Sequence, residues 1–81
     1  MMATVTVLYF ASLRDASGVA SERIVSDAVD LQGLYAELQS RHGFALPAAR
    51  LRVAADGEFA RWGDALREGC EIAFIPPVSG G

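Results

Sequence analysis

Hydrophobic and polar residues alternate in residues 4–10, which read TVTVLYF. Val5, Val7 and Tyr9 share one side of an extended chain, and Phe10 lies on the other side. The segment is rich in β-branched and aromatic residues, so the pattern predicts a strand. We expect the side that carries Val5, Val7 and Tyr9 to face the core.

The next segment, ASLRDASG at residues 11–18, breaks this alternation and is compatible with one helical turn. Residues 20–25 then give a second, shorter strand. The two strands are expected to form a hairpin with a long loop.

A helical period follows the second strand. Its apolar face consists of Leu31, Leu34, Tyr35 and Leu38, at the spacing of one helix face. Asp30 is a good N-cap, and Val29 is expected to pack on Leu34 as a hydrophobic staple. Gly43 can adopt the left-handed conformation that ends a helix. Gly33 is the one residue that disfavours the helix, at a cost of up to about 1 kcal/mol.

Three further strands are predicted at residues 51–54, 58–62 and 71–75. Asp56 and Gly57 join the first two of these, because Asp-Gly is a strong hairpin signal. The order of strand, strand, helix and three strands predicts an α+β domain, with a mixed sheet of about five strands packed on one main helix. One helix covers only one face of a sheet, so the other face must meet solvent or a partner.

Two large apolar residues are expected on that uncovered face. Phe10 points away from the core side of the first strand, and Ile75 points away from Phe74 in the last strand. An exposed apolar patch of this kind marks an interface. Scattered surface hydrophobic residues are an equal alternative on alternation alone.

Composition limits the class of protein. The chain has 81 residues, which suits one domain, and its net charge is −3. All seven cations are arginines that do not cluster, so nucleic acid is not an expected partner. The N-terminal stretch lacks a basic leader, no apolar run is long enough for a membrane span, and there is a single cysteine. These features predict a cytoplasmic protein that does not associate with membranes.

Individual polar and aromatic residues do not form a recognisable catalytic or metal site. Cys70 has Glu68 and Glu71 beside it, which oppose a reactive thiolate, so a structural role is expected rather than a persulfide site. His42 is expected to be a surface histidine at the end of the helix, and Trp62 a core or rim aromatic residue like Tyr35. No metal, bound cofactor or catalytic activity of the chain alone is expected.

The chain ends in PPVSGG. Pro76 and Pro77 cannot donate a backbone hydrogen bond, so they end the last strand. This divides the chain into a domain of residues 1–77 and a flexible Gly-Gly tail of residues 78–81. Glycine at the last two positions passes through narrow channels, which suits delivery of the Gly81 carboxylate into another protein's active site. ATP could activate that carboxylate, but the chain has no phosphate-binding loop, so a partner would bind the nucleotide.

The strand and helix layout resembles the ubiquitin-like β-grasp fold. PPVSGG looks like the tail of the small, sulfur-carrying subunit of molybdopterin synthase. The segments LYFASLRDASG and LREGCEIAFIPPVSGG are similar to the first and last strands of that family, so the resemblance covers the whole chain.

The resemblance implies two partners and a mechanism. An adenylating, sulfur-loading enzyme uses ATP to charge Gly81, which becomes a thiocarboxylate. The tail, with Val78, Ser79 and Gly80, then enters the large catalytic subunit and donates sulfur to cyclic pyranopterin monophosphate. The resemblance also implies an apolar docking surface, made of Phe10, Phe59, Ile75, Pro76 and Pro77.

Some positions depart from the family or have no assigned role. Cys70 and Asp56 stand where relatives commonly have aspartate and asparagine. Arg14 matches an arginine of the family's first loop, and we assign it no role. Two alternatives stay open: a sulfur carrier for thiazole synthesis, and a ubiquitin-like modifier or interaction module.

Overall fold

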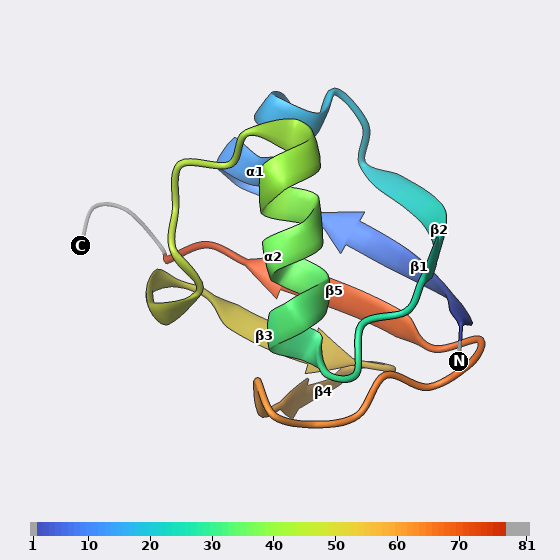
Figure 1. The fold of residues 1–81 in the computed structure, drawn as a ribbon. Coiled ribbons are helices and arrows are strands. Elements are labelled where there is room, and N and C mark those ends of the chain that lie inside the picture. The colour runs from blue at the N-terminus through green and yellow to red at the C-terminus, as the bar shows by residue number, and fades with distance from the viewer. Residues whose placement is uncertain (1, 78–81) are drawn as a thin grey trace.

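The computed structural model describes residues 2–77 (Figure 1). In chain order its elements are β1 Ala3–Tyr9, α1 Ala11–Ser17, β2 Ser21–Ser26, α2 Leu31–His42, the 3₁₀ helix η1 Ala48–Arg50, β3 Arg52–Ala55, β4 Glu58–Ala60 and β5 Glu71–Ile75. The strands form one sheet in the order β2-β1-β5-β3-β4. β1 and β5 run parallel, and the other neighbouring pairs run antiparallel. The predicted α+β class is confirmed, with five strands in a mixed sheet.

Helix α2 crosses one face of the sheet (Figure 1) and supplies the helix side of the core. Its caps are the predicted ones. The backbone N–H of Gly33 donates to Asp30 Oδ1 at 2.8 Å, and Gly43 ends the helix with a φ of 72°. A Cβ on Gly33 would lie 3.2 Å from Asp30 Oδ1, so glycine at this position leaves room for the cap.

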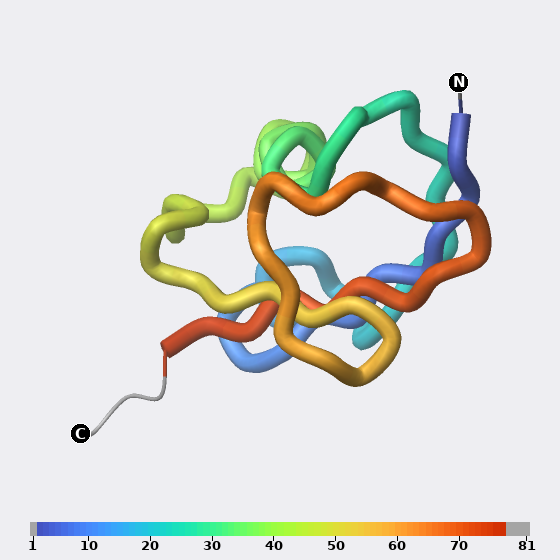
Figure 2. Tube along the Cα trace, turned by 90° about the horizontal axis from the view of Figure 1, so that it is seen from below, coloured from blue at the N-terminus to red at the C-terminus, as the bar shows by residue number. Residues whose placement is uncertain are grey.

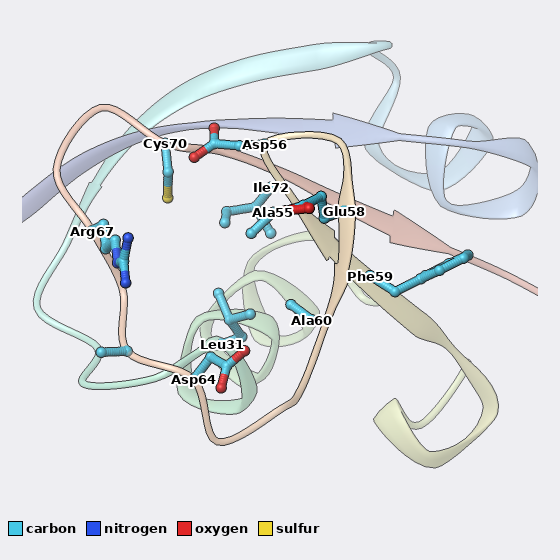
Figure 3. Close-up of a pocket in the computed structure, with 11 residues that line it drawn as sticks. Leu31, Ala55, Asp56, Glu58, Phe59, Ala60, Asp64, Arg67, Cys70 and Ile72 are labelled. Atoms are coloured by element: carbon cyan, nitrogen blue, oxygen red, sulfur yellow. The ribbon is translucent and has the colours of Figure 1, made fainter.

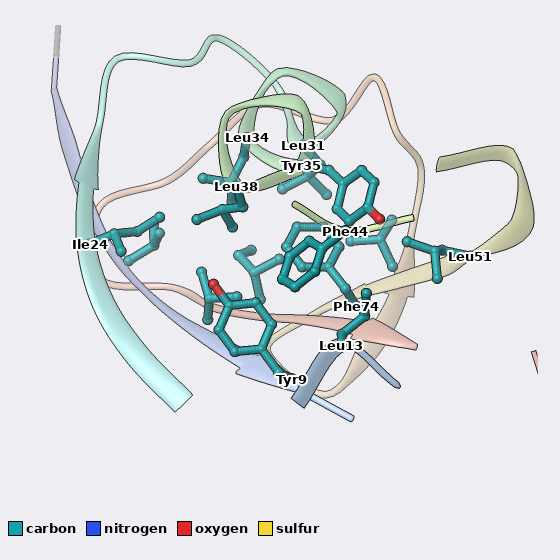
Figure 4. Packing of buried hydrophobic residues seen from close by; sticks show 14 of the residues in the cluster. Tyr9, Leu13, Ile24, Leu31, Leu34, Tyr35, Leu38, Phe44, Leu51 and Phe74 are labelled. Atoms are coloured by element: carbon teal, nitrogen blue, oxygen red, sulfur yellow. The ribbon is translucent and has the colours of Figure 1, made fainter. Parts of the chain in front are cut away.

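The core fills the space between α2 and the sheet (Figure 4). The side of β1 predicted to face inward is buried, and so are the helix positions with apolar spacing. The largest fully buried side chains include Tyr9, Leu13, Leu31, Leu34, Tyr35, Leu38, Ile72 and Phe74. Burial of these side chains supplies most of the stabilising free energy of a domain this small.

The predicted hydrophobic staple is wrong. Val29 is 82% exposed and does not cover Leu34, which is fully buried. The residues just before α2 lie against the long loop of residues 61–70. Figure 2 shows this loop along one side of the molecule, where it connects β4 to β5. The carbonyl of Val29 accepts a hydrogen bond from Leu66, and Asp30 bridges to Ala65, so the backbone rather than the Val29 side chain engages the neighbouring loop.

The same loop completes the helix N-terminus. Leu31 donates its backbone N–H to the carbonyl of Asp64 at 3.1 Å, and Gln32 donates to Trp62 at 3.0 Å. The first N–H groups of a helix have no partner within the helix, so these bonds satisfy two of them.

Other boundaries differ by a few residues from the predictions. The segment compatible with one turn forms the seven-residue helix α1, which ends at Gly18 with a φ of 82°. β4 ends at Ala60 rather than at residue 62, because Asp64 accepts from the backbone of Arg61 and closes a turn. The strand predicted from residue 51 begins at 52, because Leu51 still donates to Ala48 in η1.

No helix in residues 2–77 combines the length and apolar character needed to cross a membrane.

Candidate functional site

Strand β5 leads to the predicted tail from the centre of the sheet. It pairs with β1 on one side and β3 on the other, and its last pair joins Ile75 to Arg52. Pro76 and Pro77 follow at once, and neither has an N–H to continue the pairing. Four of the predicted site residues, Val78, Ser79, Gly80 and Gly81, lie outside the described residues, so their predicted role stays a prediction.

A groove of about 510 Å³ lies at this end of β5. We call it the tail groove. It is lined by Arg50, Arg52, Phe59, Ile75, Pro76 and Pro77, with Ala49 and Leu51 completing the lining. Figure 1 shows η1 beside the last described residues, just before the start of β3. The structure therefore brings together four of the five predicted docking residues, although they come from β4, β5 and the segment after it.

Phe10 is the fifth docking residue, and it does not line the tail groove. It is 46% exposed, as predicted, and it follows Tyr9, which is the partner of Phe74 in the pairing of β1 with β5. Phe10 thus lies at the same end of the sheet as Ile75. Its part in docking stays a prediction.

An apolar row crosses the uncovered face of the sheet. Pairing aligns Leu8 with Ala73, Ala73 with Ala54, and Ala54 with Phe59. Phe59, at the end of this row, is 69% exposed. The row joins the tail groove through Phe59, although Phe59 is its one exposed member: Ala54 is buried, and Leu8 and Ala73 are partly buried.

Arg50 and Arg52 at the tail groove were not expected from the sequence. Both are exposed, and neither forms an ion pair with another residue in 2–77. The guanidinium carbon of Arg52 lies 5.3 Å from the centre of the Phe59 ring, within the range of a cation–π contact. The alternation of Arg50, buried Leu51 and Arg52 was visible in the sequence, but only the folded sheet places both arginines beside Pro76 and Pro77.

A second hollow of about 400 Å³ lies at the other end of β5, between the strands and the 61–70 loop. We call it the acidic hollow. Its lining includes Asp56, Glu58, Asp64 and Arg67, together with Cys70 and Ile72. Figure 3 shows the Cys70 sulfur among these side chains. Phe59 also belongs to the lining, so it borders both the acidic hollow and the tail groove, although its ring points away from the other labelled side chains.

Cys70 is a buried free thiol. It is 6% exposed and packs with the core cluster. A reactive cysteine needs access and a positive environment. Its burial supports the predicted structural role over a persulfide site.

The prediction for His42 is right about its position at the end of α2 and wrong about its exposure. Its side chain is only 16% exposed, and Nε2 lies 2.7 Å from Glu22 Oε2. Tyr9 donates its hydroxyl to the same oxygen at 2.5 Å, and the Tyr9 and His42 rings meet edge to face at 5.6 Å. Glu22 on β2 thus ties β1 to the end of α2.

This arrangement changes the ionisation of two groups. Burial raises the pKa of Tyr9 far above its ordinary value, and the hydrogen bond to Glu22 adds to the effect. Burial opposes ionisation of Glu22, but hydrogen bonds from Tyr9 and His42 outweigh it, so the pKa of Glu22 falls below its ordinary value. The network holds the fold together, far from the tail groove, and is not part of the candidate site.

The sequence predicted no metal site and gave Arg14 no role. Among residues 2–77 there is no group of three or more histidine, cysteine or acidic side chains placed to hold a metal ion. Arg14 lies exposed on α1, where its carbonyl accepts from Gly18 at the helix end, and within residues 2–77 its side chain makes no hydrogen bond or ion pair that would give it a role.

Comparison with known proteins gives one family and several relatives. The sequence pattern of the ThiS family matches residues 7–81, which includes the tail. The chain is 40% identical to the human (Homo sapiens) molybdopterin synthase sulfur carrier subunit, over 95% of this chain and 93% of that protein.

Two solved structures share the fold. The H. volcanii small archaeal modifier protein 1 has a TM-score of 0.79 and 26% identity, over 94% of this chain and 99% of that one. A chain of the protein-protein complex of subunits 1 and 2 of the molybdopterin-converting factor from Helicobacter pylori 26695 has a TM-score of 0.63 and 28% identity, over the full length of both chains. The predicted ubiquitin-like β-grasp fold is confirmed by this agreement.

Proposed function

The chain belongs to the ThiS family, and from this membership together with its curated relatives we propose that it is the sulfur carrier subunit of molybdopterin synthase. The observation that carries the proposal is the 40% identity to a protein of that name along nearly the whole of both chains. The structure supports it by leading the central strand β5 straight toward the PPVSGG tail, beside an exposed apolar surface.

The proposed chemistry begins at the carboxylate of Gly81. A partner enzyme binds ATP and joins this carboxylate to AMP, with release of pyrophosphate. A sulfide equivalent from a sulfur donor then attacks the acyl carbon and displaces AMP, which leaves a thiocarboxylate in place of the carboxylate. The mixed anhydride makes AMP a good leaving group, whereas a free carboxylate oxygen is a poor one.

The charged tail then acts in a second protein. We propose that residues 78–81 enter the large subunit, where the sulfur of the Gly81 thiocarboxylate forms a bond to a carbon of cyclic pyranopterin monophosphate and displaces an oxygen substituent. Water then cleaves the bond between the Gly81 acyl carbon and sulfur, which restores the carboxylate and leaves the sulfur on the acceptor. Two such transfers supply the two sulfur atoms of the dithiolene. Glycine at positions 80 and 81 lets the backbone pass a narrow channel and approach the reacting atoms. Catalysis in this scheme belongs to the large subunit, as predicted.

The partner assignment also rests on a relative. The Helicobacter pylori protein of similar fold is one subunit of a two-subunit complex. In this chain the corresponding contact would use the tail groove, where Phe59, Ile75 and the two prolines meet. The adenylating enzyme, and a cytoplasmic location, stay predictions from the sequence.

Intact mass spectrometry tests the proposal. The chain is expressed with its organism's adenylating enzyme and a sulfur source. We expect a mass increase equal to the replacement of one oxygen by sulfur, which is lost when Gly81 is deleted. Gly63→Ala is the matched control, because Gly63 has open space around it and lies far from the tail in sequence.

Cys70→Ala separates this chemistry from the persulfide alternative. A thiocarboxylate exchanges one atom and survives this substitution, whereas a persulfide adds a whole sulfur atom and requires the thiol. A loaded product that depends on Cys70 and not on Gly81 would refute the proposal.

A second candidate function is a ubiquitin-like modifier. The similarity to small archaeal modifier protein 1 favours it, since that protein has the same fold over nearly its whole length. A modifier would appear in cell extracts as a ladder of larger species that disappears when Gly81 is deleted. We expect the free chain and its complex with the large subunit to predominate instead.

A further inference from the structure

We propose that Arg50 and Arg52 make the tail groove a docking site for an acidic protein surface. In this docking, carboxylate side chains of the partner pair with the two guanidinium groups, while its apolar side chains cover Phe59 and Ile75. The inference rests on the proposed function, because the partner is the large subunit that takes up the tail.

The first support is the separation of charge along β5. The chain is acidic overall, with ten acidic residues and seven arginines, yet no acidic residue lines the tail groove. The acidic hollow at the opposite end of β5 has three carboxylates and one arginine. The positive charge at the tail groove is therefore a local feature, and it selects for a partner surface of opposite sign.

Arg50 and Arg52 are also ready to bind, because they have no ion-pair partner to lose in the described part of the chain and Arg52 is restrained. Within residues 2–77 neither one is paired with a carboxylate, so neither must break an ion pair before it binds. The guanidinium group of Arg52 lies against the Phe59 ring, which restrains the side chain, and its N–H groups, which match a planar carboxylate, have no hydrogen-bond or ion-pair partner within residues 2–77. An arginine held in this way loses less conformational entropy when it binds.

The third support concerns what else could pair with these arginines. Four extended residues beyond Pro77 span about 13–14 Å. When the tail is extended into a partner, the Gly81 carboxyl group, and any nucleotide joined to it, lies farther from the groove than an arginine side chain extends. Carboxylates on the protein surface around the channel entrance are therefore favoured over nucleotide phosphates.

The test measures binding to the large subunit of molybdopterin synthase from the same organism. The affinity and the association rate are determined by surface plasmon resonance at low and high salt for the wild-type chain and for R50E/R52E. Arg23→Glu is the matched control, because Arg23 is exposed on β2 at the far edge of the same sheet. Thermal unfolding of each variant checks that the fold is kept.

We expect the double variant to bind about tenfold or more weakly at low salt, mainly through a slower association rate, and to approach the wild type at high salt. Arg23→Glu should stay within about twofold of the wild type. Equal binding by the double variant and the wild type would overturn the inference. So would a loss in Arg23→Glu of about half the logarithmic loss of the double variant, because Arg23→Glu changes the net charge by half as much and such a loss would indicate a general charge effect.

Two further outcomes are distinguishable. In the first, the wild-type chain loads sulfur, and added AMP weakens its binding to the large subunit. If R50E/R52E abolishes this effect of AMP, the arginines bind nucleotide and the inference is wrong. If the wild-type chain neither loads sulfur nor binds the large subunit, the proposed function fails and the inference fails with it.

Discussion

Glu22 shows how one carboxylate can hold three elements together. It accepts one hydrogen bond from Tyr9 and lies within hydrogen-bond distance of His42, and the charge of Arg41 also acts on it. Tyr9 is almost fully buried, so loss of its acceptor would leave a polar hydroxyl without a charged partner. The contribution of this network to stability therefore depends on ionised Glu22.

We predict that Glu22→Gln lowers the free energy of unfolding by about 1–2 kcal/mol at neutral pH, because a neutral amide replaces a charged acceptor, and hydrogen bonds to charged groups contribute about 1.5–3 kcal/mol against about 1 kcal/mol for neutral ones. The pKa of Glu22 is lower in the folded than in the unfolded chain, so ionised Glu22 stabilises the fold above its ordinary value of 4.5. That stability is lost as the pH falls through the lower, folded value. The difference between wild type and variant should therefore shrink in acid.

Thermal unfolding between neutral and acidic pH measures this difference. Glu58→Gln is the control, because Glu58 is exposed on β4 and makes no side-chain hydrogen bond within residues 2–77. A gap between wild type and Glu22→Gln that stays constant down to the lowest pH would contradict the assignment.

At the scale of elements, α2 depends on its cap. Asp30 accepts the N–H of Gly33, while Leu31 and Gln32 donate to the 61–70 loop. We predict that Asp30→Ala lowers the free energy of unfolding by about 1 kcal/mol, because one N–H at the helix start loses its acceptor. Chemical denaturation measures the change, and Asp27→Ala, at an exposed position three residues earlier, should have little effect. Equal loss in both variants would mean that charge rather than capping is responsible.

Elements with local signals could be predicted from the sequence. Helix α2 was predicted with both caps, because the leucine spacing, Asp30 and Gly43 are all contained in one short segment. The Asp56-Gly57 turn was predicted for the same reason, and its φ values of 51° and 85° suit a hairpin turn. The end of β4 was missed, because the apolar pattern runs on to Trp62, whereas the Asp64 carboxylate accepts from the backbone of Arg61 and closes a turn there.

In the candidate site, too, some residues were predicted from the sequence and others were not. Alternation predicted that Phe10 and Ile75 point away from the core, and the family resemblance added Phe59 and the prolines. The sequence did not reveal Arg50 and Arg52 as part of the site, because their neighbours come from β4 and β5. It did not reveal the pairing of His42 with Glu22 either, since twenty residues separate them and only the packing of α2 against β2 brings them together.

In the whole molecule, one face of the sheet packs on the core and the other face is open to a partner. α2 and the core cover one face, and the uncovered face carries the apolar row from Leu8 to Phe59. The arginines and prolines of the tail groove lie at one end of β5, and the carboxylates of the acidic hollow at the other. A partner that approaches the tail therefore meets apolar and positively charged side chains together.

Phe59 is the residue best placed to anchor such a partner. It ends the apolar row, lines the tail groove and holds Arg52 on its ring. It is also 69% exposed, so the isolated fold gains little from its side chain. We predict that Phe59→Ala weakens binding to the large subunit by about tenfold, or about 1.4 kcal/mol, since aromatic residues at the centre of an interface often contribute this much.

The same substitution should change the free energy of unfolding by no more than about 0.5 kcal/mol, as for other exposed positions. Calorimetric titration against the large subunit measures the affinity, and thermal unfolding measures the stability. Val29→Ala is the matched control, because Val29 is the most exposed large apolar side chain in residues 2–77 and precedes α2, away from the tail groove. Unchanged affinity in Phe59→Ala would show that the apolar surface of the sheet does not meet this partner. Equal losses in both variants would mean that the large subunit responds to exposed apolar area in general.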